Sequence, residues 1–282
     1  MKIGIFTVCM PEYEPEQCFE QVAPLGYNGL EWRVCADSGD RSNPSYWNGN
    51  RNSMTPDVLI EKAPVLRSLA EKYGMEMPAL GAYLNCSDMD GAEAAFKAAN
   101  ACGAKNVRVN TAGYRKDRPF LEQLREVREQ YGKIERLAKK YGVRAVMETH
   151  MGLVNPTIST SMQILDGLDP AYAGVIWDPG NQVVEGSERY DMAIRAAGPY
   201  LAEVHVKNCI FNPKKMAGGR VVWDTLWTSL ALGRVDWPAV VAELKTNGYD
   251  GWLMIEDFSL MQATGEKLKE DIDFLRGSCG VA

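Results

Sequence analysis

Residues 143–181 read VRAVMETHMGLVNPTISTSMQILDGLDPAYAGVIWDPGN and contain the repeating unit of the fold. The runs 143–149 and 174–178 are short and apolar, with several β-branched residues, which is typical of buried strands. Between them, the apolar residues of 157–167 recur at helical spacing. A strand, a helix and a second strand in this order form a βαβ unit, whose two strands are parallel.

The same alternation extends outward from this stretch almost to both ends of the chain. Strands are expected at residues 2–8, 29–34, 75–83, 106–110, 143–149, 174–178, 201–207 and 252–256. Helices are expected at residues 15–25, 55–73, 91–102, 118–141, 157–167, 187–197, 237–247 and 266–276. Eight such units in 282 residues predict an α/β fold, a (β/α)8 TIM barrel formed as a single domain by residues 1–282.

An open, doubly wound sheet is the alternative fold. It is disfavoured because no glycine-rich GxGxxG or GxxxxGK[ST] motif follows any expected strand. Two connections are unusually long. Residues 37–56 form a polar loop, and residues 208–236 have mixed character, with a short helix expected near 224–231.

Composition excludes several functional classes. The chain has 31 basic and 37 acidic residues, a net charge of −6, and no basic patch suited to nucleic acid. Seven cysteines without a CxxC motif indicate reduced thiols. No signal peptide and no apolar run of about 18 residues is found, so we expect a cytoplasmic protein with no membrane partner.

Polar residues end four consecutive expected strands. Glu148, Asp178, His205 and Glu256 each follow an apolar run, where a barrel places its catalytic groups. Taken singly, each residue has a structural explanation, such as a helix cap, an ion pair or a core histidine. Together they favour a metal site, because three carboxylates repel one another in a low-dielectric place unless a cation offsets their charge.

The ligand set also indicates the kind of cation. Three carboxylates and one imidazole, with no thiolate, suit one divalent Mn²⁺, Mg²⁺ or Co²⁺ ion better than Zn²⁺ or copper. The only two histidines, His150 and His205, both lie at strand ends. Alternation along a strand places His150 beside Glu148 and Lys207 beside His205, so we expect both at the rim, facing substrate oxygens.

Several motifs resemble those of the sugar phosphate isomerase/epimerase family, the xylose-isomerase-like barrels that include ketose 3-epimerases and inosose dehydratases. The similarity covers nearly the whole chain and ends at Glu256. The motifs are residues 2–5 (KIGI), 26–33 (GYNGLEWR), 148–150 (ETH), 177–181 (WDPGN), 205–208 (HVKN), 233–238 (GRVDWP) and 248–252 (GYDGW).

The resemblance implies roles for individual residues. The family's metal ligands correspond to the four residues named above, and Glu148 and Glu256 correspond to the acid/base pair of the epimerases. The matched motifs also place Glu31, Trp177 and Asn181 among the substrate-binding residues. Two departures count against a plain ketose epimerase: Asn181 stands where these often have histidine, and Asn208 where many members have aspartate.

The expected reaction is proton abstraction next to a carbonyl of an open-chain sugar or keto-cyclitol, through a metal-stabilised enediolate. Return of the proton gives an isomerase or epimerase, whereas loss of a β-hydroxyl gives a dehydratase or lyase. A non-catalytic sugar-binding subunit is the third alternative. Hydride-shift isomerisation, as in xylose isomerase itself, is disfavoured because that enzyme type has a lysine three residues after the metal-binding glutamate, where this chain has Met151. An endonuclease with a trinuclear zinc cluster is disfavoured because such a cluster needs several histidines and this chain has two.

Aromatic residues in the two long loops allow two interpretations. The residues are Tyr46, Trp47, Trp223 and Trp227. They are expected to form the wall of a sugar pocket, the interface of a homo-oligomer (a dimer or tetramer), or a mixture of the two. Arg220 is expected to be a solvent-exposed charge, so no phosphorylated substrate is inferred. The expected partner is a small-molecule sugar or cyclitol.

Overall fold

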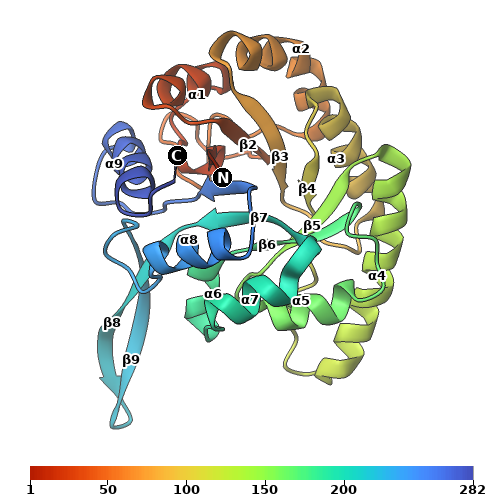
Figure 1. The fold of residues 1–282 in the computed structure, drawn as a ribbon, viewed down its shortest axis with the longest axis vertical. Coiled ribbons are helices and arrows are strands. Elements are labelled where there is room, and N and C mark those ends of the chain that lie inside the picture. The colour runs from red at the N-terminus through yellow and green to blue at the C-terminus, as the bar shows by residue number, and fades with distance from the viewer. Residues whose placement is uncertain (282) are drawn as a thin grey trace.

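A closed barrel of eight parallel strands forms the centre of the computed structural model, which describes residues 1–281 (Figure 1). Each strand pairs with the next along the chain, and the last, β10, pairs with β1 to close the barrel. This confirms the predicted fold class. The strands are β1 (Lys2–Phe6), β2 (Gly29–Val34), β3 (Glu76–Ala82), β4 (Asn106–Arg108), β5 (Arg144–Glu148), β6 (Ala173–Trp177), β7 (Leu201–Val206) and β10 (Trp252–Ile255).

Helices surround the barrel and cover its outer face (Figure 1). Local signals set their ends: Thr55 accepts a hydrogen bond from Val58 N at the start of α2, and Gly74, with φ of 63°, ends it. Within residues 1–281, no helix is long and apolar enough to cross a membrane. The helices are α1 (Pro15–Val22), α2 (Pro56–Tyr73), α3 (Met89–Cys102), α4 (Phe120–Tyr141), α5 (Ile158–Leu165), α6 (Pro179–Glu185), α7 (Tyr190–Ala197), α8 (Trp237–Thr246) and α9 (Thr264–Gly277), with 3-10 turns at Thr7–Cys9, Ala23–Leu25 and Gly198–Tyr200.

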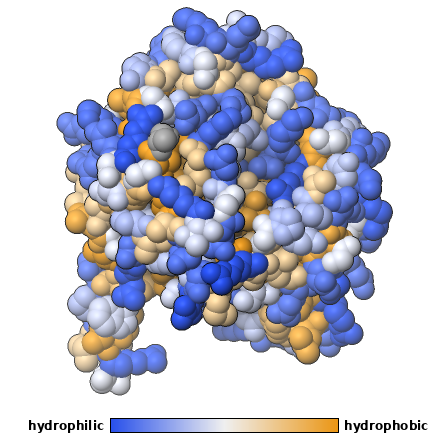
Figure 2. Space-filling model, viewed as in Figure 1, coloured by the Kyte–Doolittle hydropathy of each residue, from blue (hydrophilic) through white to orange (hydrophobic). Residues whose placement is uncertain are grey.

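The connection after β7 differs from the sequence prediction. Residues 208–236 hold no helix near 224–231; instead β8 (Asn208–Ala217) and β9 (Arg220–Thr228) form an antiparallel hairpin. Gly218 and Gly219 form its turn with φ of 57° and 75°, the left-handed conformation that tight hairpin turns require. The hairpin projects from the body of the molecule with hydrophobic and hydrophilic residues side by side (Figure 2). The segment between β6 and β7 also differs from the prediction of one helix at residues 187–197. It holds two short helices: α6 begins directly after β6, and α7 begins only at Tyr190.

Strand register brings the polar strand ends close together, with a two-residue offset at Glu148, which pairs with Ile176, and at Glu256. Trp177 of β6 pairs with Val204 of β7, so the next residues on each strand, Asp178 and His205, come side by side. Ile255 of β10 pairs with Val206, which places Glu256 level with Lys207. The convergence of these side chains is therefore a consequence of the parallel ladder.

Glycines inside the barrel make room for large side chains. A Cβ on Gly81 would lie 2.3 Å from the Phe6 ring and 2.9 Å from Glu31 Oε1. A Cβ on Gly4 would lie 2.4 Å from Met254 Sδ. Outward-facing residues such as Trp32 and Trp177 are fully buried in the layer between strands and helices.

Gly81→Ala is expected to destabilise the fold by about 1–3 kcal/mol, because the added methyl group overpacks the barrel interior. Urea unfolding of the purified variant measures this. Gly277→Ala is the matched control: its Cβ meets nothing within 4 Å, so it should be neutral or slightly stabilising. Equal stability of the two variants would contradict this packing.

Candidate metal centre and active site

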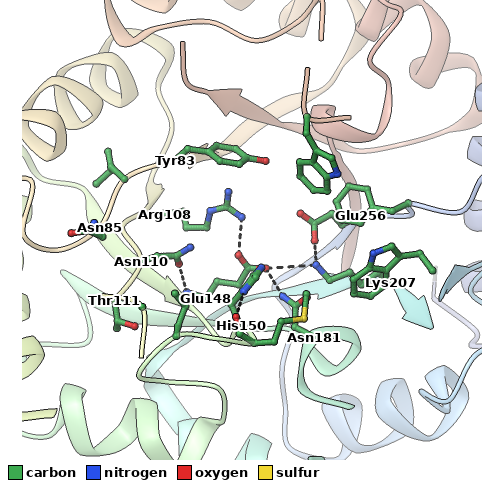
Figure 3. A pocket seen from close by; sticks show the side chains of 17 residues that line it. Tyr83, Asn85, Arg108, Asn110, Thr111, Glu148, His150, Asn181, Lys207 and Glu256 are labelled. Atoms are coloured by element: carbon green, nitrogen blue, oxygen red, sulfur yellow. Dashed lines mark hydrogen bonds and ion pairs between the residues drawn. The ribbon is translucent and has the colours of Figure 1, made fainter. Parts of the chain in front are cut away.

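A cavity of about 550 Å³ opens at the carboxyl ends of the strands (Figure 3). Glu148, at the end of β5, and Glu256, directly after β10, lie on its floor with Arg108 of β4. Lys207, Asn181 and His150 also line it. Five of the sequence-predicted residues therefore meet in one cavity, at the end of the barrel where this fold carries its catalytic groups.

Four of the predicted residues form a cluster with the ligand set of a divalent cation. Ligand atoms of Glu148, Asp178, His205 and Glu256 all lie within 4.8 Å of one another, and all four side chains are buried. Groups of this charge are rarely buried unless they are paired or hold a metal. The donors are three carboxylates and one imidazole, as the sequence predicts.

The orientation of His205 leaves one ring nitrogen for an ion. Its Nε2 lies 3.0 Å from Glu31 Oε2, whereas Nδ1 has no hydrogen-bond partner and lies 3.3 Å from Glu148 Oε1. Burial alone would lower the pKa of His205, but Glu31, Glu148 and Glu256 outweigh it and raise the pKa well above its usual value. A carboxylate behind a histidine is the arrangement that orients metal-binding imidazoles.

Asp178 serves two purposes with its two oxygens. Oδ1 accepts a hydrogen bond from Asn181 N at 2.8 Å and caps α6, while Oδ2 lies 2.7 Å from Lys207 Nζ. Burial raises the pKa of Asp178 to about 7, helped by Glu148 and Glu256 and opposed by Lys207. Asp178 can therefore cap α6 with one oxygen and still offer the other to a metal ion.

Two cations offset part of the negative charge. Arg108 Nη1 donates to Glu148 Oε2 at 2.8 Å, and this guanidinium holds the pKa of Glu148 well below its usual range although burial would raise it. The Lys207 ammonium contacts Asp178 and Glu256 and lies 3.8 Å from Glu148 Oε1. These carboxylates keep the pKa of Lys207 high despite its burial.

The remaining cavity residues hold or extend the cluster. Asn181 Nδ2 donates to Glu148 Oε1 at 3.0 Å and to Asp178 Oδ2 at 2.9 Å, so it fixes two carboxylates relative to each other. His150 Nδ1 lies 2.7 Å from the carbonyl oxygen of Met151. Because a carbonyl only accepts, Nδ1 carries the proton and Nε2 is the free ring nitrogen.

Two residues expected to bind substrate do not line the cavity. Glu31 lies inside the barrel against His205, where it orients the imidazole. Trp177 points outward: its Nε1 donates to Gln182 Oε1 at 2.8 Å and its ring packs edge-on against Tyr190. On this geometry we assign Glu31 a positioning role and Trp177 a packing role.

Two polar residues of the barrel interior were not predicted from the sequence. Arg108 ends the fourth strand as Glu148 ends the fifth, and Glu203 lies two residues before His205 on the same face. Burial and the charge of Glu31 raise the pKa of Glu203 to about 8. Because side chains alternate along a strand, the sequence could have placed both residues on the inner face of the barrel. Each of them, however, stands at a position expected to be apolar.

A family model described as "Xylose isomerase-like TIM barrel" matches residues 19–278. The chain belongs to this family. Among curated relatives, inosose dehydratase of Clostridium tetani is 26% identical over 141 residues, covering 48% of this chain and 47% of that protein. Inosose dehydratase of Clostridium perfringens is 24% identical over 264 residues, 86% of this chain and 81% of that protein. The chain thus spans about half the length of the C. tetani protein that it matches.

Solved structures of similar fold come from enzymes and metal-binding proteins. The apo form of 3-keto-D-glucoside 4-epimerase, YcjR, from E. coli matches with a TM-score of 0.71 at 14% identity, covering 98% of this chain and 99% of that one. The IOLI protein with a bound zinc atom matches with a TM-score of 0.73 at 16% identity, covering 99% and 98%. A Mycobacterium smegmatis protein of this fold, in complex with magnesium, matches with a TM-score of 0.68 at 14% identity, covering 97% and 95%.

The cluster is expected to bind one divalent ion per chain, which titration calorimetry with Mn²⁺ measures. His205→Gln should weaken binding at least tenfold, because it removes the only nitrogen donor. His150→Gln is the matched control and should bind like the wild type. Equal affinity of the two variants would place the ion elsewhere.

Glu203 is expected to make the protein less stable as the pH rises. Its folded pKa of about 8 exceeds the ordinary value of 4.5, so the native state binds more protons than the unfolded state in this window. Stability therefore falls between about pH 5 and pH 8. Glu203→Gln, which resembles the protonated carboxyl, should reduce this loss in thermal unfolding; an unchanged pH dependence would contradict the assignment.

Proposed function

We propose that this protein is a divalent-metal-dependent sugar isomerase or epimerase that removes a proton next to a carbonyl. One observation carries the proposal: Glu148 and Glu256, from different sides of the barrel, both line the cavity, and their carboxylates cluster with the side chains of Asp178 and His205. A bound divalent cation supplies Lewis-acid polarisation of neighbouring substrate oxygens. The zinc and magnesium reported for structures of the same fold support a divalent ion here, and manganese is the metal we would test first.

The two glutamates are suited to act as a pair of bases. Arg108 and Lys207 hold the pKa values of Glu148 and Glu256, respectively, below the usual range despite burial, so both side chains are carboxylates at neutral pH. One takes the carbon-bound proton at a carboxylate oxygen, and the other, after gaining a proton from solvent, returns one to the carbon. Because they come from β5 and the end of β10, they approach a substrate from two directions, as inversion at carbon requires.

The polar rim is suited to orient a polyol. His150 Nε2 and the amide oxygen of Asn181 are acceptors, and the ammonium of Lys207 is a donor. These groups hold hydroxyl and carbonyl oxygens in a fixed position, which is what a proton transfer at carbon demands. Arg220 is exposed at the start of β9 and does not line the cavity, so the geometry gives no phosphate-binding role to it.

Dehydration of a keto-cyclitol or keto-sugar is the second candidate reaction. It is favoured by the inosose dehydratase relatives and by Asn181 and Asn208, which depart from the epimerase pattern. In this protein Asn208 holds the loop after the hairpin, since its Nδ2 donates to the carbonyls of Leu230 and Val235. Both reactions begin with the same proton abstraction. A homo-oligomer, with exposed Trp223 as a candidate interface residue, stays a prediction for light scattering to test.

Proton abstraction is expected to exchange substrate hydrogen with solvent. We expect the Mn²⁺-loaded protein, incubated in D₂O with a panel of ketoses, keto-cyclitols and keto-glycosides, to place deuterium on the carbon beside the carbonyl. Mass spectrometry separates the two outcomes, because a dehydratase product is lighter by one water. Absence of exchange on every compound would contradict the proposal.

Glu256→Gln distinguishes an enzyme from a sugar-binding subunit. An enzyme should lose exchange by about 10²-fold or more while the folded variant still binds the same compound. Glu20→Gln, on the exposed face of α1, is the control and should exchange like the wild type. If the protein only binds sugars, neither the wild type nor Glu256→Gln would show exchange, and Glu256→Gln would bind the compound more weakly than the wild type.

A further inference from the structure

One side of the cavity is an aromatic wall that proton abstraction does not explain. We define it as Trp47 from the loop after β2, Trp227 near the end of β9 and Phe258 just after β10. The ring centres of Trp47 and Phe258 are 4.6 Å apart, and those of Trp227 and Phe258 are 6.0 Å apart. Three segments far apart in sequence thus build a single apolar face.

The wall is anchored by a buried polar network behind it. Tyr46 Oη donates to the carbonyl of Ser259 at 2.8 Å and accepts from Lys267 Nζ at 2.8 Å. Lys267 is 2% exposed and also donates to the carbonyl of Asp257 at 2.9 Å. These bonds tie the loop that carries Trp47 to the segment that carries Phe258. A fixed aromatic face loses little freedom when a ligand binds to it.

The wall extends from the reacting groups outward. Lys207 Nζ, which contacts Asp178, lies 5.3 Å from the centre of the Phe258 ring and 5.5 Å from that of Trp227. Trp47, in contrast, is 54% exposed although its loop is anchored. Phe258 and Trp227 therefore face the reacting unit of a substrate, whereas Trp47 forms the outer part of the wall and presents an uncovered indole.

The cavity is larger than one sugar unit needs. Even at the roughly 30 Å³ that a water molecule occupies in the liquid, the twelve non-hydrogen atoms of a hexose need only about 360 Å³. The cavity measures about 550 Å³. Room therefore remains for a second ring, and the aromatic wall is the part of the lining that an apolar ring face suits.

We propose that the aromatic wall is a subsite for a ring linked to the reacting sugar, so that the substrates are glycosides. This inference rests on the proposed function and names its substrate class. The anomeric carbon of a glycoside is blocked, so the ring cannot open. The carbonyl next to which a glutamate removes the proton then belongs to the pyranose ring itself, and Trp47 stacks on the ring attached at the anomeric carbon.

Calorimetry on the Mn²⁺-loaded protein tests the subsite with methyl β-D-glucoside, phenyl β-D-glucoside and methyl β-cellobioside. These probes lack a carbonyl and are not turned over. We expect one or both of the two-ring probes to bind roughly tenfold tighter than the methyl glucoside. Tighter binding of phenyl glucoside indicates an aryl aglycone, and tighter binding of methyl cellobioside indicates a second sugar.

Substitutions locate the gain on the wall. Trp47→Ala should abolish the tenfold difference and leave the methyl glucoside affinity within twofold of wild type, while Trp47→Phe should restore part of it. Trp223→Ala is the matched control, because this exposed tryptophan lies on the hairpin and does not line the cavity. Equal binding of all three probes, no binding of any, or a gain that survives in Trp47→Ala would overturn the subsite.

The subsite and the proposed reaction fail in different ways. Deuterium exchange on a ketose without any gain from a second ring would retain the reaction and reject the subsite. A gain that depends on Trp47, without exchange on any keto compound, would retain the subsite and reject the reaction.

Discussion

Burial of negative charge at the mouth of the barrel is the constraint on which the site depends. Glu31, Glu148, Asp178 and Glu256 bring four carboxylates into one buried region, where the protein supplies two permanent cations. Arg108 and Lys207 therefore offset only part of the negative charge, and a bound divalent cation would offset more of it. Glu203, the fifth carboxyl of this region, has a pKa of about 8 and so adds little negative charge at neutral pH.

The scaffold makes this concentration of charge possible. Parallel pairing holds the four strand ends close together, and glycines such as Gly81 leave space for Phe6 and Glu31 inside the barrel. Apolar layers outside the strands supply the stability that offsets a polar interior. Loop residues then determine what reaches the site. The anchored loop that carries Trp47 builds one wall, and polar side chains build the opposite one.

The strand–helix alternation of the sequence predicted the barrel, and the polar residues at four strand ends predicted the candidate ligands. Both features are local, so they can be recognised without the structure. The hairpin of β8 and β9 was wrongly expected to include a helix. Its Gly218–Gly219 turn was visible in the sequence, but the helical spacing of residues 224–231 outweighed it. Trp177 was wrongly expected to bind substrate, although alternation along the strand turns it away from the side of its neighbour Asp178. Glu31 faces the barrel interior, but its depth below the cavity depends on strand register, which a sequence motif does not carry. Arg108 was not predicted because it stands in an expected apolar strand; alternation could have placed it on the inner face, where it contacts Glu148.

The central claim is that one cation is held jointly by Glu148, Asp178, His205 and Glu256. Anomalous diffraction from a crystal soaked in Mn²⁺, recorded at the manganese absorption edge, tests this most directly. The account predicts one strong peak per chain within coordination distance of carboxylate oxygens and of Nδ1 of His205. A peak at any other place, or no peak at manganese concentrations that support proton exchange, would contradict it.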